Sequence, residues 1–245
     1  MLVNERQNEI LTYLKNNKTA NVRTLAKKLY VSEATVRRDL RALGDMGLLE
    51  RCHGGALLPE NTNEQSMSLR ILKNATEKHH IANTALDALP AFGSVFLDGS
   101  STVLALAERM NLSSKTVITN NLQAALVLSQ IPDINLHMLG GNVKYNSNAT
   151  SGSATLRQIE GISVDLMLCS CASVKEGECA ERTFELAELK RSVFVRSHKR
   201  ILLVDSAKFG AFGTYSISKL TDFDMIITDK KPSDEILTLG ANIIY

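Results

Sequence analysis

The residues best suited to chemistry in this 245-residue chain lie in the stretch FLDGSSTVLALAERM, residues 96 to 110. A buried strand is expected to break at Asp98, and four small residues then lead into an amphipathic helix: Gly99, Ser100, Ser101 and Thr102. The free N–H groups and the dipole of a helix start attract anions, and glycine permits close approach. The pattern predicts a phosphate-binding loop, which would suit an enzyme or a sensor equally well.

A second group of candidate residues is basic and lies near the N-terminus. Two short helical patterns, around 4 to 16 and 22 to 29, precede a third that is N-capped by Ser32 and runs to about Asp45, with Gly47 as its expected stop. Apolar residues fall on one side of this third helix, and three arginines fan out over the other: Arg37, Arg38 and Arg41. The segments LLERC, HGG and ALL then predict two strands joined by a glycine turn.

Three helices followed by such a hairpin predict a winged helix-turn-helix that binds double-stranded DNA. The planar guanidinium of arginine can bind guanine or a phosphate through two parallel hydrogen bonds. Further contacts are expected from the helix start and from the wing: Ser32, Thr35, Arg51 and His53. The alternative is a solvated basic face on which Arg37 or Arg41 pairs with Asp39 or Asp45.

Charge and composition support a DNA-binding N-terminal region. Residues 1 to 60 hold ten Lys or Arg and seven Asp or Glu, a net charge of +3, whereas the remainder carries −1. Because there is neither a secretory signal nor an apolar run of the length that a membrane helix needs, we expect a cytoplasmic protein without membrane contact. Cys169, Cys171 and Cys179 are interpreted as small hydrophobes, and neither a metal nor a cofactor is expected.

The chain after residue 75 alternates short apolar runs with helical patterns. Residues 59 to 74 lose this periodicity and are predicted to be a linker between a domain at 1 to 58 and one at 75 to 245. Helices are expected at 102–110, 121–130, 153–160, 180–198 and 232–239. The alternation predicts an α/β fold with a mainly parallel sheet, whose ligand lies at the carboxyl ends of the strands.

The run VSEATVRRDLRALGDMGLLERCHGGA resembles the winged helix-turn-helix of the DeoR family of bacterial transcriptional regulators, and the resemblance extends over nearly the whole chain. It implies a sensor domain similar in fold to ribose phosphate isomerases and CoA transferases, with phosphorylated sugars as effectors. The stretches LDGSST, VITNN, LGGNV, TSGSAT, AELKRSVF and LLVDSAKFG resemble the motifs of this domain. Besides the first loop, they assign effector binding to Thr119, Asn120, Gly141, Gly152, Lys190 and Lys208.

The residue types fit these assignments. Lys208 follows a strand and can offer a positive charge to a phosphate, while Asp98 and Asn120 could hold sugar hydroxyls. Two simpler alternatives are that Lys190 is an exposed helix residue and that Asp205 only orients Lys208 or caps a turn.

The sequence departs from the family pattern at three positions. Ser100 stands where the first loop most commonly has glycine, and Ser170 and Ser173 stand where glycines usually follow the strand at 164–171. Since serine restricts the backbone and close approach, these positions put the details of the pocket in question.

Two classes of function compete: a ligand-controlled transcription factor, and a sugar phosphate isomerase with a DNA-binding appendage. An isomerase needs a carboxylate base, for which Asp98, Glu181 and Glu188 are the candidates. Because no second convincing base is present, we predict a non-enzymatic repressor of a carbohydrate operon. We expect it to bind its operator as a dimer or tetramer and to be released by a phosphorylated sugar.

Overall fold

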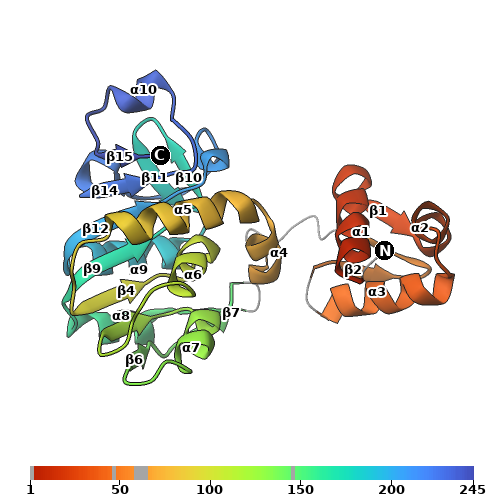
Figure 1. Ribbon diagram of the computed structural model, residues 1–245, viewed down its shortest axis with the longest axis horizontal. Helices are drawn as coiled ribbons and strands as arrows, with labels where there is room; N and C mark the ends of the chain where they lie inside the picture. Colours follow the sequence, from red (N-terminus) through yellow and green to blue (C-terminus); the bar gives the residue numbers. More distant parts are fainter. Residues whose placement is uncertain (1–2, 46–47, 58–65, 145–146) are drawn as a thin grey trace. The chain divides into compact units, whose positions relative to one another are not determined.

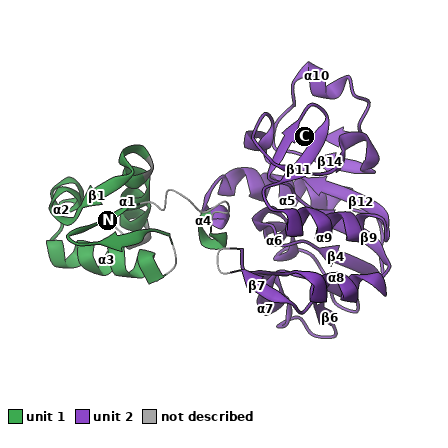
Figure 2. Cartoon of the chain, turned by 180° about the vertical axis from the view of Figure 1, so that it is seen from behind, with its two compact units in different colours: residues 1–69 green, residues 70–245 purple. Residues whose placement is uncertain are grey.

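The computed structural model describes residues 3–45, 48–57, 66–144 and 147–245. The chain divides into two compact units, Met1–Leu69 and Arg70–Tyr245 (Figure 2). Helix α4 (Met67–Leu72) crosses this boundary, so the end of the predicted linker is helical. Residues 59 to 65 of that linker, and the predicted helix stop at Gly47, lie outside the described residues.

The first unit is a winged helix (Figure 1). Its elements, in chain order, are α1 (Val3–Asn17), β1 (Thr19–Asn21), α2 (Val22–Leu29), α3 (Glu33–Asp45), β2 (Glu50–Cys52) and β3 (Gly55–Leu57). The strands form an antiparallel sheet in the order β1-β3-β2. The sequence predicts β2 and β3 but not β1, because three residues are too few to show a periodic pattern.

One core holds the three helices and the small sheet together. Ile10, Leu25, Leu40 and Leu49 are among its buried members. Asp39 is also buried, and its carboxylate accepts hydrogen bonds from Arg6 Nε at 2.5 Å and Arg6 Nη2 at 3.0 Å. This ion pair fixes α1 against α3, and hydrogen bonding to Asp39, with its charge attraction, raises the pKa of Arg6.

The second unit is built on a seven-stranded sheet in the order β15-β14-β12-β9-β4-β5-β6, with every pairing parallel. The strands are β4 (Ser94–Leu97), β5 (Thr116–Thr119), β6 (Asn135–Met138), β9 (Val164–Cys169), β12 (Ser197–Leu203), β14 (Met225–Ile227) and β15 (Ile243–Ile244). The helices are α5 (Ala75–Ala88), α6 (Ser101–Ala107), α7 (Leu122–Leu128), α8 (Ser153–Glu160), α9 (Phe184–Phe194) and α10 (Asp234–Leu237). The predicted mainly parallel α/β fold is confirmed.

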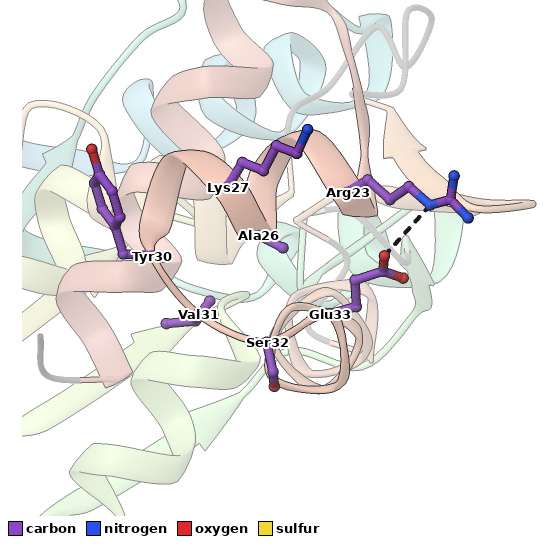
Figure 3. Close-up of a pocket in the computed structure, with 7 residues that line it drawn as sticks. All are labelled: Arg23, Ala26, Lys27, Tyr30, Val31, Ser32 and Glu33. Atoms are coloured by element: carbon purple, nitrogen blue, oxygen red, sulfur yellow. Dashed lines mark ion pairs between the residues drawn. The ribbon is translucent and has the colours of Figure 1, made fainter.

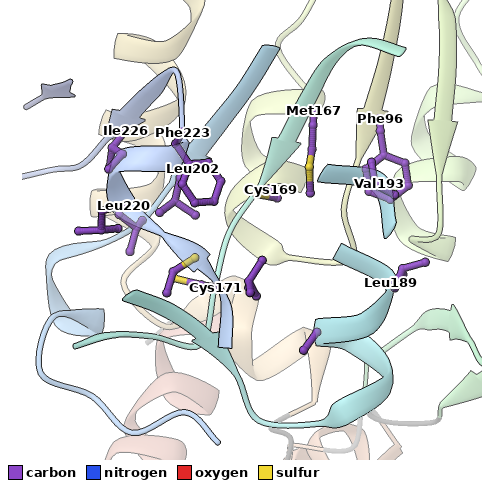
Figure 4. Close-up of a cluster of buried hydrophobic side chains, with 14 of the residues drawn as sticks. Phe96, Met167, Cys169, Cys171, Leu189, Val193, Leu202, Leu220, Phe223 and Ile226 are labelled. Carbon is purple, nitrogen blue, oxygen red and sulfur yellow. The ribbon is translucent and has the colours of Figure 1, made fainter. Parts of the chain in front are cut away.

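Helices cover both faces of this sheet, with α5 and α6 packed together on one face and α8 and α9 on the other (Figure 1). The core beneath α8 and α9 joins Met167 and Cys169 from β9 to Ala187 and Val193 from α9 (Figure 4). Cys171 and Cys179 are buried in the same cluster, so the interpretation of these cysteines as small hydrophobes holds.

Two smaller sheets were not predicted. Strands β7 (Asn142–Lys144) and β8 (Ala149–Ser151) pair with each other, and β10 (Ser173–Lys175), β11 (Glu178–Glu181) and β13 (Tyr215–Lys219) form a separate antiparallel sheet. The predicted helix at 180–198 is therefore wrong at both ends, since β11 continues to Glu181 and β12 begins at Ser197. Gly177, with φ +79°, makes the turn between β10 and β11 that the sequence interpretation overlooked.

Strand order places the site of this unit. From β4 the chain moves through α6 to β5 and then β6, whereas from β9 it moves through α9 to β12 on the opposite side. The direction of winding thus reverses between the adjacent strands β4 and β9. In open α/β sheets the crevice at the carboxyl ends of such strands is the usual ligand site. Among the described residues, no helix is long and apolar enough to cross a membrane.

Candidate DNA-binding surface and effector site

Helix α3 presents the predicted DNA-binding residues. Val36, Leu40 and Leu43 are buried, which turns Arg37, Arg38 and Arg41 towards solvent. Ser32 caps the helix as predicted: its Oγ accepts a hydrogen bond from the Thr35 N–H at 3.2 Å and lies 2.9 Å from the Thr35 hydroxyl.

The arginines differ in their partners. Arg37 binds Glu33 at 3.1 Å, one helical turn away, while Asp39 is occupied by Arg6. The suggested pairing of Arg37 or Arg41 with Asp39 is therefore wrong. Within the part of the chain that the structure describes, Arg38 and Arg41 form no ion pair, so both guanidiniums are open to an external anion.

Gly54 and Gly55, the two glycines of the wing, are needed for different structural reasons. Gly54 has φ +81° and makes the turn, and its carbonyl accepts a hydrogen bond from Val22 N–H at the start of α2. Gly55 pairs with Asn21 of β1, and a Cβ there would clash with the Ala20 carbonyl oxygen. His53 is exposed at this turn, and the exposed Arg51 lays its side-chain stem against Gly44 of α3.

A shallow groove lies between α2 and the start of α3 (Figure 3). Arg23, Lys27 and Tyr30 line it from α2 and the following turn, and Ser32 and Glu33 line it from α3. Arg23 Nε lies 3.5 Å from Glu33 Oε1, so Glu33 links α2 to α3.

In the second unit, Asp98 directly follows β4 at the reversal point and is 1% exposed. Its Oδ1 accepts from Ser100 N–H at 2.9 Å, and its Oδ2 accepts from Ser170 N–H at 3.0 Å. Asp98 therefore ties the loop after β4 to the loop after β9, and both of its oxygens are occupied by groups of the protein.

Lys190 completes this connection from α9. Its Nζ lies 2.8 Å from Asp98 Oδ2 and 2.5 Å from Glu181 Oε1, and it donates to the Ser170 carbonyl at 2.6 Å. Burial alone would lower the pKa of Lys190, but attraction to Asp98 and Glu181 outweighs it and raises the pKa well above its ordinary value. The simpler interpretation of Lys190 as an exposed helix residue is wrong.

The first loop has the predicted local geometry with a shifted helix start. Ser100 is the N-cap of α6, and its Oγ accepts from Val103 N–H at 3.1 Å. Gly99 and Ser100 are half-buried, whereas Ser101 and Thr102 are buried in the first turn of the helix. Ser100 adopts φ −91°, a conformation that serine tolerates, so the position does not require glycine.

Asn120 lies beside this loop at the end of β5. Its Nδ2 donates to the Thr150 carbonyl at 3.0 Å, and among the described residues its buried Oδ1 has no hydrogen-bond partner. A Cβ on Gly99 would lie 3.6 Å from that oxygen and 2.9 Å from Ala149 Cβ. Thr119 is fully buried, and its Oγ1 donates to the Leu97 carbonyl and accepts from Asn121 N–H.

The other two predicted glycines lie around β7 and β8. Gly141 has φ +146°, and a side chain there would clash with Thr155 of α8. Gly152 has φ +100° and stands at the N-cap of α8. Both positions require glycine for backbone reasons, whatever they bind.

Lys208 lies at the carboxyl end of β12, on the predicted edge of the sheet, within a single turn, Ser206–Lys208. Ser206 fixes this turn by donating from N–H and Oγ to the two Asp229 oxygens at 2.6 and 2.9 Å. The carboxylate of Asp205, just before this turn, accepts a hydrogen bond from Asn74 Nδ2 at 2.9 Å. This role differs from the suggested one of orienting Lys208. Two strand spacings, about 10 Å, separate β12 from β4 across the sheet.

Lys78 is a neighbouring group that the sequence analysis missed. Only 5% exposed, it extends from α5 and donates to the carbonyls of Arg70 and Lys73 at the end of α4. Burial is the main cause that lowers the pKa of Lys78 to about 8. Attraction to Asp205 opposes this shift, and repulsion from Lys208, Arg70 and Lys73 adds to it. The available signal was spacing, since Lys78 shares the buried stripe of α5 with Ile81, Ala82 and Ala85.

The serines that replace expected glycines are both buried. Ser170 contributes its backbone, as N–H donor to Asp98 and carbonyl acceptor for Lys190. Ser173 points its hydroxyl at Gly213, where any Cβ would clash with it. The space beside Ser173 is thus provided by a glycine elsewhere in the chain.

Taken together, a winged helix joined to a parallel α/β unit with converging polar strand ends defines a DNA-binding regulator with a ligand-sensing unit. Comparison with known proteins agrees: residues 6–62 match the DeoR-like helix-turn-helix domain, and residues 73–230 match the DeoR C-terminal sensor domain. The chain belongs to the DeoR family of transcriptional regulators.

Two relatives match over almost their full length. The HTH-type transcriptional regulator GolR of Listeria innocua is 36% identical over 231 residues, 93% of this chain and 91% of that protein. The lactose phosphotransferase system repressor of Streptococcus mutans is 32% identical over 244 residues, 96% of each chain. Among solved structures, ribose 5-phosphate isomerase A from Neisseria gonorrhoeae aligns with 54% of this chain and 52% of that chain at 15% identity, with a TM-score of 0.39.

We expect Lys190→Met to lower the free energy of unfolding of the second unit by about 3–5 kcal/mol, because Asp98 and Glu181 would remain buried without a counter-ion. Urea unfolding would measure this. The control is Lys199→Met, which breaks the exposed Lys199–Asp224 pair and should cost less than about 1 kcal/mol. Equal, small losses in the two variants would contradict the importance of the buried pair.

A pH dependence follows from Lys78. Its pKa is about 8 in the folded chain and 10.5 ordinarily, so between these values the unfolded chain binds more protons. Lys78 should therefore make stability rise with pH across this window. Relative to wild type, Lys78→Met should lose this rise in urea unfolding measured from pH 7 upward, whereas substitution of the exposed Lys230 should preserve it. Parallel curves for wild type and Lys78→Met would exclude the shift.

Proposed function

We propose that this regulator is a repressor of a carbohydrate-utilisation operon and that a phosphorylated sugar releases it from operator DNA. The observation that carries the proposal is that one chain holds both an open arginine face on α3 and cationic, glycine-containing loops at the carboxyl ends of the sheet strands in the second unit. The similarity to a lactose phosphotransferase system repressor supports repression as the sign of the regulation and carbohydrate use as its subject.

On the DNA side, α3 enters the major groove and Arg38 and Arg41 reach base edges or phosphates. Arg37 exchanges Glu33 for DNA, while the hydroxyls of Ser32 and Thr35 lie where the helix start approaches the groove. The wing residues Arg51 and His53 contact the adjacent backbone or minor groove.

On the effector side, the phosphate binds at the carboxyl edge of the sheet. Lys208 supplies the charge, and the loop from Gly99 to Thr102 supplies N–H groups at the start of α6. Asn120 Oδ1, a buried acceptor that no described residue uses, takes a sugar hydroxyl. Gly141 and Gly152 shape the neighbouring loops.

Asp98, Thr119 and Lys190 belong to the same site but act through the protein. Their polar atoms already bind backbone groups and one another, so they hold the loops at the reversal point in place. This occupation also argues against isomerase activity, because Asp98 and Glu181, two of the three candidate bases, are both bound by Lys190. We infer that the protein senses its ligand without converting it.

The protein acts in the cytoplasm as a homo-oligomer, a dimer or tetramer, because repeated operator half-sites require repeated winged helices. The effector releases DNA by binding more tightly to the arrangement of units that cannot bind the operator.

Arg38→Ala should weaken operator binding by about 5- to 150-fold, the loss of one base or phosphate contact worth about 1–3 kcal/mol. The measurement is a gel shift with duplexes that the wild-type protein selects from a random pool. Arg157→Ala, an exposed arginine on α8, is the control and should bind as wild type. Wild-type affinity in folded Arg38→Ala would remove Arg38 from the interface.

A thermal-shift screen tests the effector. Among hexose phosphates, pentose phosphates and glycerol 3-phosphate, at least one should raise the Tm, since a ligand present at 100 times its Kd adds about 2.7 kcal/mol to stability. Lys208→Met should abolish the response, and Lys230→Met should retain it. No shift with any of these compounds would refute sugar phosphate sensing.

A further inference from the structure

The groove between α2 and α3 contains a row of three hydrogen-bond donors. Arg23, Lys27 and Tyr30 follow one another at spacings of four and three along α2 and its C-cap, away from the buried face of that helix (Figure 3). Arg23 is directed to the start of α3 by its ion pair with Glu33. The row therefore borders the end of α3 that approaches DNA.

Tyr30 has an unfavourable backbone for its residue type. Its φ of 55° and ψ of 42° place it in the left-handed region, at a C-cap position that favours glycine or asparagine. The other non-glycine residues with positive φ in the described chain all have polar, non-aromatic side chains: Lys18, Asn74, Ser114, Asp133, Asn148 and Glu176. Tyr30 is the aromatic exception.

The Tyr30 side chain adds no packing that would offset this backbone strain. It is 95% exposed, so its ring buries almost no apolar surface, and its backbone N–H bond to the Ala26 carbonyl would form with any residue other than proline. Strain that is retained without a packing benefit points to a function for the side chain.

The surroundings of Tyr30 are suited to a polyanion. Lys27 lies one turn before it and, within the described residues, forms no ion pair. Lys28, in contrast, turns to the Tyr13 ring, with its Nζ 4.8 Å from the ring centroid. Lys27 and the Tyr30 phenol are thus the donors of this row that remain open, beside the exposed Ser32.

We propose that Tyr30 binds the DNA backbone next to the groove that α3 enters, its phenol O–H donating a hydrogen bond to a phosphate oxygen while Lys27 supplies charge. In a helix-turn-helix the first helix of the motif crosses the backbone, which is the position of α2. Tyrosine hydroxyls are regular phosphate donors, and such contacts carry no sequence information. Tyr30 therefore contributes to affinity on any duplex.

The test uses a labelled random-sequence duplex at low salt, so no operator need be known. Tyr30→Phe keeps the ring and removes the donor. We expect unchanged Tm and about 3- to 10-fold weaker binding by fluorescence anisotropy, the fold-change of one lost hydrogen bond. Because the phenol is neutral, the salt dependence should stay as in wild type, whereas Lys27→Met should reduce its slope by about 1.

Tyr30→Asn separates strain from binding. Asparagine tolerates the left-handed backbone, so this variant should have a higher Tm and yet bind the duplex as weakly as Tyr30→Phe. The control is Glu176→Gly, which relieves a φ of 52° in the second unit and should raise the Tm with unchanged DNA affinity. Wild-type affinity in Tyr30→Phe would overturn the proposal, whereas failure of the wild-type protein to bind any duplex would refute DNA binding itself.

Discussion

The sensing unit depends on the interaction of the Lys190 ammonium group with the groups that surround it. The ammonium lies between two buried carboxylates, from the loop after β4 and from β11, and one backbone carbonyl from the loop after β9. A buried ion pair contributes little net stability compared with apolar packing, but removing one partner is costly. Its value here is geometric, because the loop after β4, the loop after β9 and β11 must meet at one point for the ammonium to be satisfied.

Whether a feature of this unit could be predicted depends on whether its contacts are local in the sequence. The loop from Asp98 to Thr102 could be predicted because strand, glycine, cap and helix are consecutive, and the sheet because parallel strands read as apolar runs. The burial of Lys190 could not be predicted, since it depends on Asp98, which is distant in sequence, and on Glu181, which lies in the unpredicted strand β11. Similarly, the predicted helix at 180–198 included the last two residues of β11, because four residues of a hairpin carry less pattern than the eleven of α9 that follow.

The DNA-binding unit was more predictable, because its contacts are local. The apolar spacing of α2 and α3 and the capping role of Ser32 follow from neighbouring residues. Strand β1 was not predicted, and neither was the reason for Gly55. The turn sequence alone does not show that β1 lies so close to Gly55 that a side chain there would clash with it.

The serines that depart from the family pattern have separate explanations. Ser100 caps α6 with ordinary backbone angles, Ser170 acts through its peptide groups, and Ser173 occupies space that Gly213 leaves open. None of the three has a positive φ, so each position accepts serine without backbone strain.

The hydrogen bond from Val22 N–H to the Gly54 carbonyl and the pairing of β1 with β3 tie the wing to the start of α2, and the shared core joins both to α3. The span of DNA that one winged helix covers is therefore set by the fold of the first unit. Under the function proposed above, an effector acts on where this unit is placed along the double helix and leaves its shape unchanged.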